Sequence, residues 1–417
     1  MSFFRINIYL KIKILLSSMT LKVSKIDKLI EKKIGEKTKK RYFIITSQLR
    51  VGFMILLSYL KKKFPTKNEI IFSPYNLQEM INVTVNLKFK VKFCDPNTET
   101  GTYSLNDLGK KINNKTLAVV ITNMFNGSAE LIKLKKFCKK KKVILIEDNA
   151  IYFDNYSKKN TNKELYSGSF GDYSLSSFNI MKNISALYGG GVATDDVQFI
   201  KYAQAKIKNF EEFPKLLMLK QSTIFFILKL FSLNLLYRIL FFKIVKFAHF
   251  KNNTTLLKLF YPSLKFTKKN FPKFYFCKIS NLAKKLIYLQ LYDKKSRKLN
   301  HTKRKNKNIF YQKIIKEKKI KQIKILIIKD NNFQNFVDFP ILVSNKDKLN
   351  KYLLKNGIET KIIHYKNCAK IFNINKNKYR NAEMFEKSII CLPNHSKINE
   401  KYMLFMINKI SQFYTKY

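Results

Sequence analysis

The sequence predicts an α/β protein with a large domain built on a mostly parallel sheet and a smaller α+β domain after it. From about residue 41, short apolar runs alternate with segments of helical periodicity. One of these runs, residues 143–146, leads into Asp148, at the carboxyl end of a predicted strand, where open α/β sheets bind ligands. The alternation stops over residues 201–275, and a new pattern of strands and helices begins after it.

The large domain is expected to contain strands and helices in regular succession. A strand over 69–73, a helix over 78–86 and a strand over 91–94 come first. A strand over 117–122, a helix with apolar residues at 131, 134, 137 and 138, and the strand over 143–146 follow. In the smaller domain we expect a basic helix ending near 318, a strand over 339–343 and a helix over 348–355.

Length and composition suit two domains. The chain has 417 residues, of which 46% are hydrophobic, so a sizeable core is expected and wholesale disorder is not. We divide it into an N-terminal segment (1–40), a large domain (41–200), a hydrophobic and basic insert (201–275) and a C-terminal small domain (276–417).

The insert contains a stretch, residues 216–250, that is crowded with Leu, Ile and Phe. Lys229, Arg238 and Lys243 interrupt it, so no uncharged run approaches the roughly 20 residues of a spanning helix. Two interpretations stay open. The segment forms helices packed in the subunit core or dimer, or amphipathic helices that make peripheral contact with a membrane.

The charge balance is strongly basic, with 82 Lys and Arg against 27 Asp and Glu and a net charge of +55. The lysines are spread along the whole chain and accompany no known nucleic-acid-binding motif. We therefore interpret the charge as a lysine-rich composition and predict no dedicated nucleic-acid binding.

Cysteine usage and the first residues bear on localisation. The five cysteines are scattered without a CxxC pair, which argues against a disulfide framework and against a zinc site. The first twenty residues alternate apolar residues with Arg5, Lys11 and Lys13, which is typical of an amphipathic segment and not of an export signal. A cytoplasmic location is expected, with peripheral association at the inner membrane as the open alternative.

The chemistry is expected at Lys182, because of its neighbours in the sequence. Ser177 precedes it by five residues, Gly189–Gly191 follow, and Asp148 ends an earlier strand. A lysine amine that binds an aldehyde covalently and a carboxylate that keeps a pyridine nitrogen protonated are what pyridoxal 5'-phosphate requires. Glu147 points to the opposite face of its strand and is assigned no chemistry. A surface lysine, a turn-capping aspartate and a structural serine are the plainer alternatives.

These residues occur in a recognisable order. They are Ile146-Glu147-Asp148, then Gly168 to Asp172, then Ser177-Phe178-x-x-x-Lys182-Asn183, then Gly190-Gly191. The pattern resembles that of the DegT/DnrJ/StrS family of pyridoxal-phosphate-dependent sugar aminotransferases. Further similarity lies at 357–360, 381–383 and 391–393, so the resemblance covers residues 41–200 and 276–417.

The resemblance implies a fold and an activity. The fold is that of the type I, aspartate-aminotransferase-like transferases, working as homodimers. The activity is transfer of an amino group, commonly from glutamate, to a nucleotide-linked keto-sugar for surface polysaccharide or lipopolysaccharide. Lys182 and Asp148 are the implied catalytic residues, and Ser177, Leu49 and Arg50 the implied ligands of the cofactor phosphate.

Departures from the family pattern support an alternative function. Leu49 stands where glycine is usual, Ile151 replaces Gln or His, and Phe276-Cys277-Lys278 replaces Asn-Tyr-Arg. Leu77 takes the place of the ring-stacking aromatic, with Tyr75 nearby, and His364-Tyr365 resembles a substrate-side pair. The alternative is a catalytically weak or silent paralogue that acts as a membrane-surface-associated binding protein.

Overall fold

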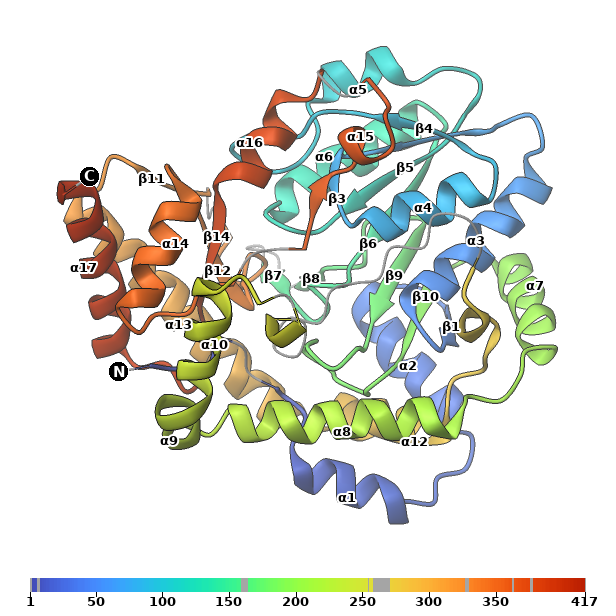
Figure 1. The fold of residues 1–417 in the computed structure, drawn as a ribbon. Helices are drawn as coiled ribbons and strands as arrows, with labels where there is room; N and C mark the ends of the chain where they lie inside the picture. Colours follow the sequence, from blue (N-terminus) through green and yellow to red (C-terminus); the bar gives the residue numbers. More distant parts are fainter. Residues whose placement is uncertain are drawn as a thin grey trace.

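A computed structural model describes most of the chain, and its elements fall into a large sheet domain, a smaller sheet domain and a helical arm (Figure 1). The described residues are 2–5, 8–158, 164–253, 255–257, 271–326, 330–361, 364–375 and 378–416. Part of the predicted insert, residues 254 and 258–270, therefore lies outside them.

The large domain is built on a seven-stranded sheet in the order β1-β10-β9-β6-β5-β2-β4. β10 pairs antiparallel with β1 and β9, and the other neighbours are parallel, so the sheet is mostly parallel as predicted. Its strands are β1 (Tyr42–Thr46), β2 (Glu69–Phe72), β4 (Lys90–Phe93), β5 (Thr116–Thr122), β6 (Ile144–Asp148), β9 (Tyr173–Ser177) and β10 (Gly190–Thr194).

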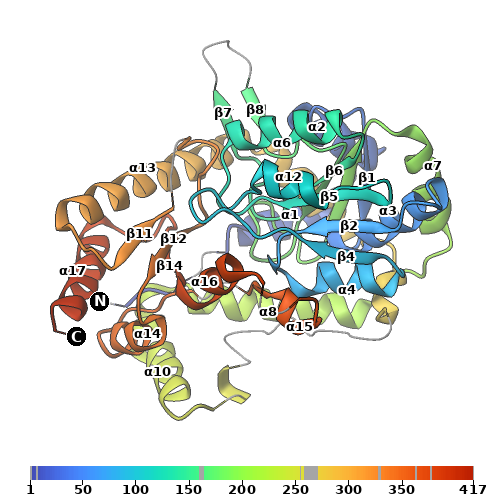
Figure 2. The same cartoon turned by 90° about the horizontal axis from the view of Figure 1, so that it is seen from above.

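Helices cover both faces of this sheet, which is why its central strands β5, β6 and β9 are almost entirely buried. Every residue of β5 is buried. Seen from above, α2 and α6 lie on one side of the sheet and α4 on the other (Figure 2). The helices of this region are α1 (Ile12–Thr20), α2 (Ile26–Thr38), α3 (Leu49–Lys63), α4 (Gln78–Asn86), α5 (Leu105–Lys111), α6 (Ser128–Lys140) and α7 (Val197–Lys208).

The small domain has an antiparallel sheet in the order β11-β12-β14, and its helices pack around it. Its strands are β11 (Ile323–Ile325), β12 (Asp338–Val343) and β14 (Ile389–Pro393). Its helices are α13 (Lys294–Lys318), α14 (Lys346–Lys355), α15 (Cys368–Ile371), α16 (Arg380–Ser388) and α17 (Glu400–Lys416). The expected basic helix ending near 318, the strand over 339–343 and the helix over 348–355 are confirmed within two residues.

Short elements connect the two domains. β13 (Lys366–Asn367) of the small domain pairs with β3 (Tyr75–Asn76) of the large one. α12 (Asn281–Tyr292), preceded by the 3-10 turn η2 (Lys273–Phe276), contacts α1 and α2. A hairpin of β7 (Tyr156–Lys158) and β8 (Glu164–Tyr166) leaves the large domain. The proposed division of the chain at 40, 200 and 275 stays a prediction.

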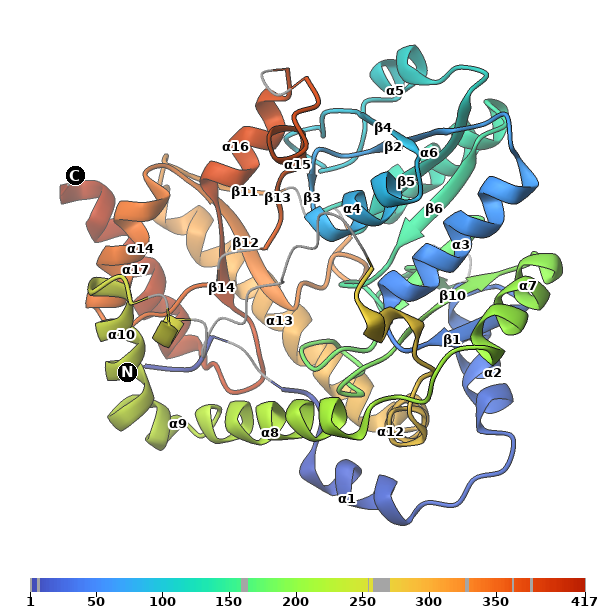
Figure 3. The same cartoon turned by 45° about the vertical axis from the view of Figure 1, so that its right-hand side comes forward.

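The insert is a bent helical arm that runs along one edge of the molecule (Figures 1 and 3). It consists of α8 (Lys215–Phe231), α9 (Asn234–Leu236), the π-helical turn η1 (Tyr237–Phe241) and α10 (Phe242–Phe250). One face of the arm joins a hydrophobic cluster with the N-terminal segment and α12. Among the described helices none alone is long and apolar enough to cross a membrane. The pair Lys215–Phe231 and Asn234–Phe250, bent by 77°, meets that test jointly on length and composition.

Candidate active site

The candidate site is a cavity of about 410 Å³ between the two domains. Its lining comes from the carboxyl ends of β6 and β9, the start of α3, the small domain, the N-terminal segment and α8. A cavity of this size is in the range of small-molecule and cofactor sites. Lys182, Asp148, Ser177, Leu49 and Arg50, the five residues predicted from the sequence, all line it.

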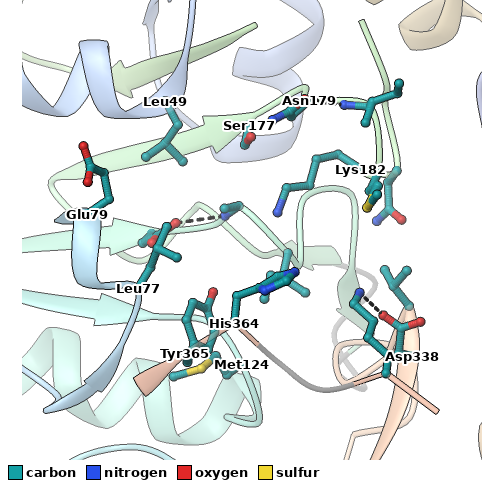
Figure 4. A pocket seen from close by; sticks show the side chains of 18 of the residues that line it. Leu49, Leu77, Glu79, Met124, Ser177, Asn179, Lys182, Asp338, His364 and Tyr365 are labelled. Atoms are coloured by element: carbon teal, nitrogen blue, oxygen red, sulfur yellow. Dashed lines mark hydrogen bonds and ion pairs between the residues drawn. The ribbon is translucent and has the colours of Figure 1, made fainter. Parts of the chain in front are cut away.

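Lys182 lies in the loop between β9 and β10, and its side chain extends into the cavity (Figure 4). The loop is fixed locally, because Lys182 N–H donates to the Asn179 carbonyl at 3.0 Å and Ser185 Oγ donates to the Ile180 carbonyl at 2.9 Å. Burial lowers the pKa of Lys182 to about 8, while the charge of Asp148 acts in the opposite direction. A sizeable fraction of this amine is therefore neutral near physiological pH, as a nucleophile or general base requires.

Asp148 ends β6, and its carboxylate is buried at the edge of the sheet. Oδ1 accepts a hydrogen bond from the Ala150 N–H at 3.0 Å. Burial raises the pKa of Asp148 to about 6, against the lowering effects of the Ala150 N–H and of Lys182. A cation placed beside this carboxylate would favour its ionised form, which is the environment that a protonated pyridine needs.

Glu147 lies on the other face of the same strand and has a structural role. Its carboxylate accepts N–H hydrogen bonds from Gly168 at 2.7 Å, Phe170 at 2.9 Å and Gly171 at 3.0 Å. These bonds hold the turn that precedes β9. The expectation that Glu147 faces away from the chemistry is confirmed.

The start of α3 provides an anion-binding geometry at the cavity. The first turn of a helix leaves N–H groups without intrahelical partners, and here that turn begins at Leu49. Gly190 allows the approach, since a Cβ on it would lie 2.1 Å from Leu49 N. The buried Ser47 Oγ and Gln48 Oε1 have no hydrogen-bond partner in the described structure. Gly190 is thus explained by the close approach of α3 to β10, whereas a Cβ on Gly191 would meet Phe43 of β1.

Arg50 is partly engaged by protein groups. Its guanidinium lies 3.8 Å from Glu79 Oε1 and donates to the Tyr275 hydroxyl at 3.4 Å. Tyr275 in turn donates to Glu79 at 2.6 Å. Arg50 is therefore held at the cavity edge by two residues that sequence reasoning did not single out.

The residues present fit pyridoxal phosphate. They supply one amine for its aldehyde, one carboxylate for its ring nitrogen, and the Ser177 hydroxyl with the first-turn N–H groups of α3 for its phosphate. The buried, unpartnered hydroxyl of Ser47 beside that helix start is the kind of donor that a bound anion would use.

We call the side of the cavity that the small domain and the N-terminal segment form the far wall. Few of its residues belong to a recognisable sequence motif. Lys361 pairs with Asp338 there, and both line the cavity (Figure 4). Arg5 reaches the same wall from the N-terminal segment and pairs at 3.4 Å with Glu359, of the 357–360 turn. No periodicity or motif marks Arg5 or Lys361. The 357–360 match and the His364-Tyr365 pair are the sequence signals that pointed to this wall.

The structure shows which of the residues that depart from the family pattern line the cavity. Ile151 and Leu77 line the cavity, as do His364 and Tyr365. Tyr75 does not line it, because its ring contacts that of Tyr365, with centroids 5.9 Å apart.

Phe276 also lies away from the cavity, where its ring contacts Phe210 at 5.8 Å. Lys278 pairs with Glu212 at 2.9 Å. The segment equivalent to Asn-Tyr-Arg therefore does not reach this cavity within one subunit.

Residues 8–211 match the model of the DegT/DnrJ/EryC1/StrS aminotransferase family. This match spans the whole large domain and contains Lys182, Asp148 and Ser177. Over its large domain the chain is similar to this family. The predicted resemblance to the family, the pyridoxal phosphate dependence and the predicted fold class are thereby confirmed.

Curated relatives match the chain over shorter stretches. The GDP-perosamine synthase of Escherichia coli O157:H7 is 33% identical over 104 residues, 25% of this chain and 27% of the relative. An uncharacterized protein of Methanocaldococcus jannaschii is 27% identical over 175 residues, 42% of each chain. The chain thus aligns with less than half the length of these two relatives.

Solved structures match over almost the full length. Helicobacter pylori PseC, an aminotransferase of pseudoaminic acid biosynthesis, has a TM-score of 0.73 at 19% identity, and the match covers 100% of both chains. A putative sugar aminotransferase from Streptococcus pneumoniae in its PLP form has a TM-score of 0.70 at 15% identity, covering 100% and 99%. A GDP-4-keto-6-deoxy-D-mannose-3-dehydratase of E. coli has 0.70 at 15%, covering 98% of each. At these identities the likeness establishes the fold of both domains.

Proposed function

We propose that this chain is an aminotransferase that moves an amino group from glutamate to a nucleotide-linked keto-sugar. The observation that carries the proposal is the placement of Lys182 and Asp148 in one cavity, beside Ser177 and the start of α3. The names of similar proteins support the sugar, because they include a GDP-perosamine synthase and an aminotransferase of pseudoaminic acid biosynthesis.

Each predicted residue takes a defined task in this proposal. Lys182 binds the cofactor aldehyde and, once released by the amino donor, moves a proton to and from the carbon that gains or loses nitrogen. Asp148 keeps the ring nitrogen protonated. Ser177, the N–H groups at Leu49 and Arg50 and the Arg50 guanidinium hold the phosphate. Bound pyridoxal phosphate supplies an electron-accepting ring.

The far wall is assigned to the acceptor. Lys361 and Arg5 bring basic groups to the cavity from the small domain and the N-terminal segment, and His364 adds a neutral imidazole, because burial lowers its pKa to about 4. A nucleotide-linked sugar carries a diphosphate, which basic side chains bind through charge-assisted hydrogen bonds. We assign the amination to surface polysaccharide or lipopolysaccharide synthesis, in a cytoplasmic homodimer whose second subunit completes the phosphate site.

Two measurements on the purified chain test the proposal. Borohydride treatment with pyridoxal phosphate, followed by peptide mass mapping, should place the pyridoxyl group on Lys182. Incubation with glutamate and a panel of UDP-, GDP- and dTDP-linked keto-sugars should then yield an amino-sugar from at least one of them. Labelling of another lysine would contradict the site, and silence across the panel with the cofactor on Lys182 would contradict the substrate.

A catalytically weak or silent paralogue is the second candidate, and two positions favour it. Ile151 brings a side chain without hydrogen-bonding groups into the cavity next to Asp148, and Leu49 brings bulk to the start of α3. A chain that binds the cofactor at Lys182 but exchanges no amino group with glutamate would fit this candidate.

A further inference from the structure

The helical arm formed by α8, α9, η1 and α10 is apolar on two opposite sides, which is unusual for a surface element. On α8, Phe225 and Leu228 are buried against the body of the protein. Leu216, Leu219 and Leu230 lie on the other side of the helix and are 79%, 63% and 50% exposed. The outer side thus resembles a second core face that the described part of the chain leaves uncovered.

The exposed side continues past the bend of the arm. Leu235 and Ile239 are 69% and 56% exposed, and Phe247 of α10 is 53% exposed. About half of the large hydrophobic side chains that are exposed in the described residues belong to this arm. We call Leu216, Leu219, Leu230, Leu235, Ile239 and Phe247 together the outer apolar face. Exposed apolar side chains that gather on one element in this way mark an interaction site.

The inner side of the arm is already fixed to the protein. The Tyr237 hydroxyl donates to Glu359, which also pairs with Arg5. Lys229 Nζ donates to the Ile8 carbonyl at 2.7 Å, and Lys397 donates to the Ser232 carbonyl. Because these contacts anchor the arm along its length, its helices cannot insert across a bilayer without losing them. A partner must therefore bind the outer apolar face from outside.

The charge around this face selects the class of partner. No Asp or Glu occurs between Glu212 and Asp293, while Lys215, Lys220 and Arg238 on the arm are exposed. Helix α1, which contacts α12 and lies lower than α8 in two views, adds exposed Leu16 and Met19 from a segment that also lacks acidic residues (Figures 1 and 3). An apolar surface whose own helices carry cations and no acidic residues is complementary to anionic lipid headgroups over acyl chains.

A second copy of the chain fits this face poorly. A two-fold contact would set the same patch against itself, so basic residues would face basic residues with no acidic partner in either arm. We propose that the outer apolar face lies flat on an anionic membrane surface and holds the protein there. Gln221 and Ile224 of the same helix line the candidate active site, so one wall of the cavity belongs to the membrane-bound element.

Vesicle flotation with the full-length protein tests this proposal without any measurement of activity. The parent should co-float with vesicles containing about one third phosphatidylglycerol and stay behind with pure phosphatidylcholine. The combined change Leu219→Gln, Leu230→Gln, Leu235→Gln and Ile239→Gln should abolish co-flotation. Changing Lys215, Lys220, Arg238 and Lys243 to Gln should lower the partition coefficient by at least about 100-fold, since each basic residue near such a surface contributes about fivefold.

Matched control variants test whether membrane binding depends on the outer apolar face or on exposed apolar and basic residues anywhere on the protein. Val85→Gln with Leu404→Gln removes exposed apolar side chains elsewhere, and Lys133, Lys136, Lys139 and Lys140 of α6 provide four exposed basic residues for the same change to Gln. Both controls should float like the parent, and borohydride labelling of Lys182 should show that every variant is folded. Co-flotation that survives the apolar changes, or a parent that stays behind at low salt, overturns the proposal. So does a shift from dimer to monomer in the apolar variant, which would assign the face to a second copy.

Discussion

The two walls of the cavity differ in where their residues come from. The near wall, with Lys182, Asp148 and Ser177, is built from strand ends and loops within about 35 residues of one another. The far wall joins Arg5 of the N-terminal segment to Lys361 of the small domain, more than 350 residues apart. The near wall lies within residues 8–211, which match the family model, and Arg5 and Lys361 of the far wall lie outside them. We infer that the near wall sets the reaction and the far wall sets the acceptor.

The largest expected effect is at the centre of the near wall. Lys182→Ala should lower amino transfer by at least about 10³-fold, because it removes both the covalent attachment point and the proton carrier. Single-turnover reaction with glutamate measures it. Lys135→Ala is the matched control, since burial lowers the pKa of Lys135 too but it lies outside the cavity. Equal activity of the two variants would remove Lys182 from the mechanism.

A second change in the near wall should lower the rate of amino transfer somewhat less. Asp148→Asn keeps the shape and the Ala150 hydrogen bond of the side chain but removes its charge, so the ring nitrogen would lose its proton. We expect binding of the cofactor to persist and reaction with glutamate to fall by about 10²-fold or more. Asp195→Asn, at an exposed and paired carboxylate, should leave the rate unchanged. A fully active Asp148→Asn variant would make the carboxylate structural.

A far-wall change should separate the two substrates. Lys361→Met removes the partner of Asp338 and leaves a carboxylate uncompensated beside the cavity. We expect the KM for the keto-sugar to rise about tenfold, the cost of one charge-assisted contact, while the reaction with glutamate stays near normal. Lys366→Met, which breaks an exposed pair with Glu386 at 3.2 Å, is the control. A Lys361 variant that slows both half-reactions equally would contradict the division between the walls.

The smallest expected effect is a shift with pH. Because burial lowers the pKa of Lys182 to about 8, its neutral fraction rises as pH increases toward 8 and levels off above it. The rate at which borohydride-trappable cofactor attaches to Lys182 should follow the same curve, just under tenfold per pH unit on the acid side. Asp148→Asn should move the midpoint lower, since the carboxylate favours the charged amine. A midpoint near 10.5 would mean that the amine is solvated.

Much of the fold was predictable because its signals are local. The helix over Gln78–Asn86 matches its predicted bounds, and β5 differs from its predicted start by one residue. The site motif was equally legible, because Ser177, Lys182 and the glycines after them lie within fifteen residues. The insert was predicted as helical from its composition, yet its two candidate environments were not separable before the structure showed one face buried and one exposed.

By itself the sequence determined the reaction class, since the residues for pyridoxal phosphate follow one another along a single stretch of the chain, from β6 to β10, and strand periodicity fixes which side they face. Only the tertiary structure decided which residues from distant parts of the chain complete the cavity around them. Arg5 reaches the cavity that Ser177 lines because the N-terminal segment packs with the helical arm, and Gly190 is needed because α3 approaches β10 at that point. Contacts between distant segments depend on the packing of the whole chain, and no local spacing records them.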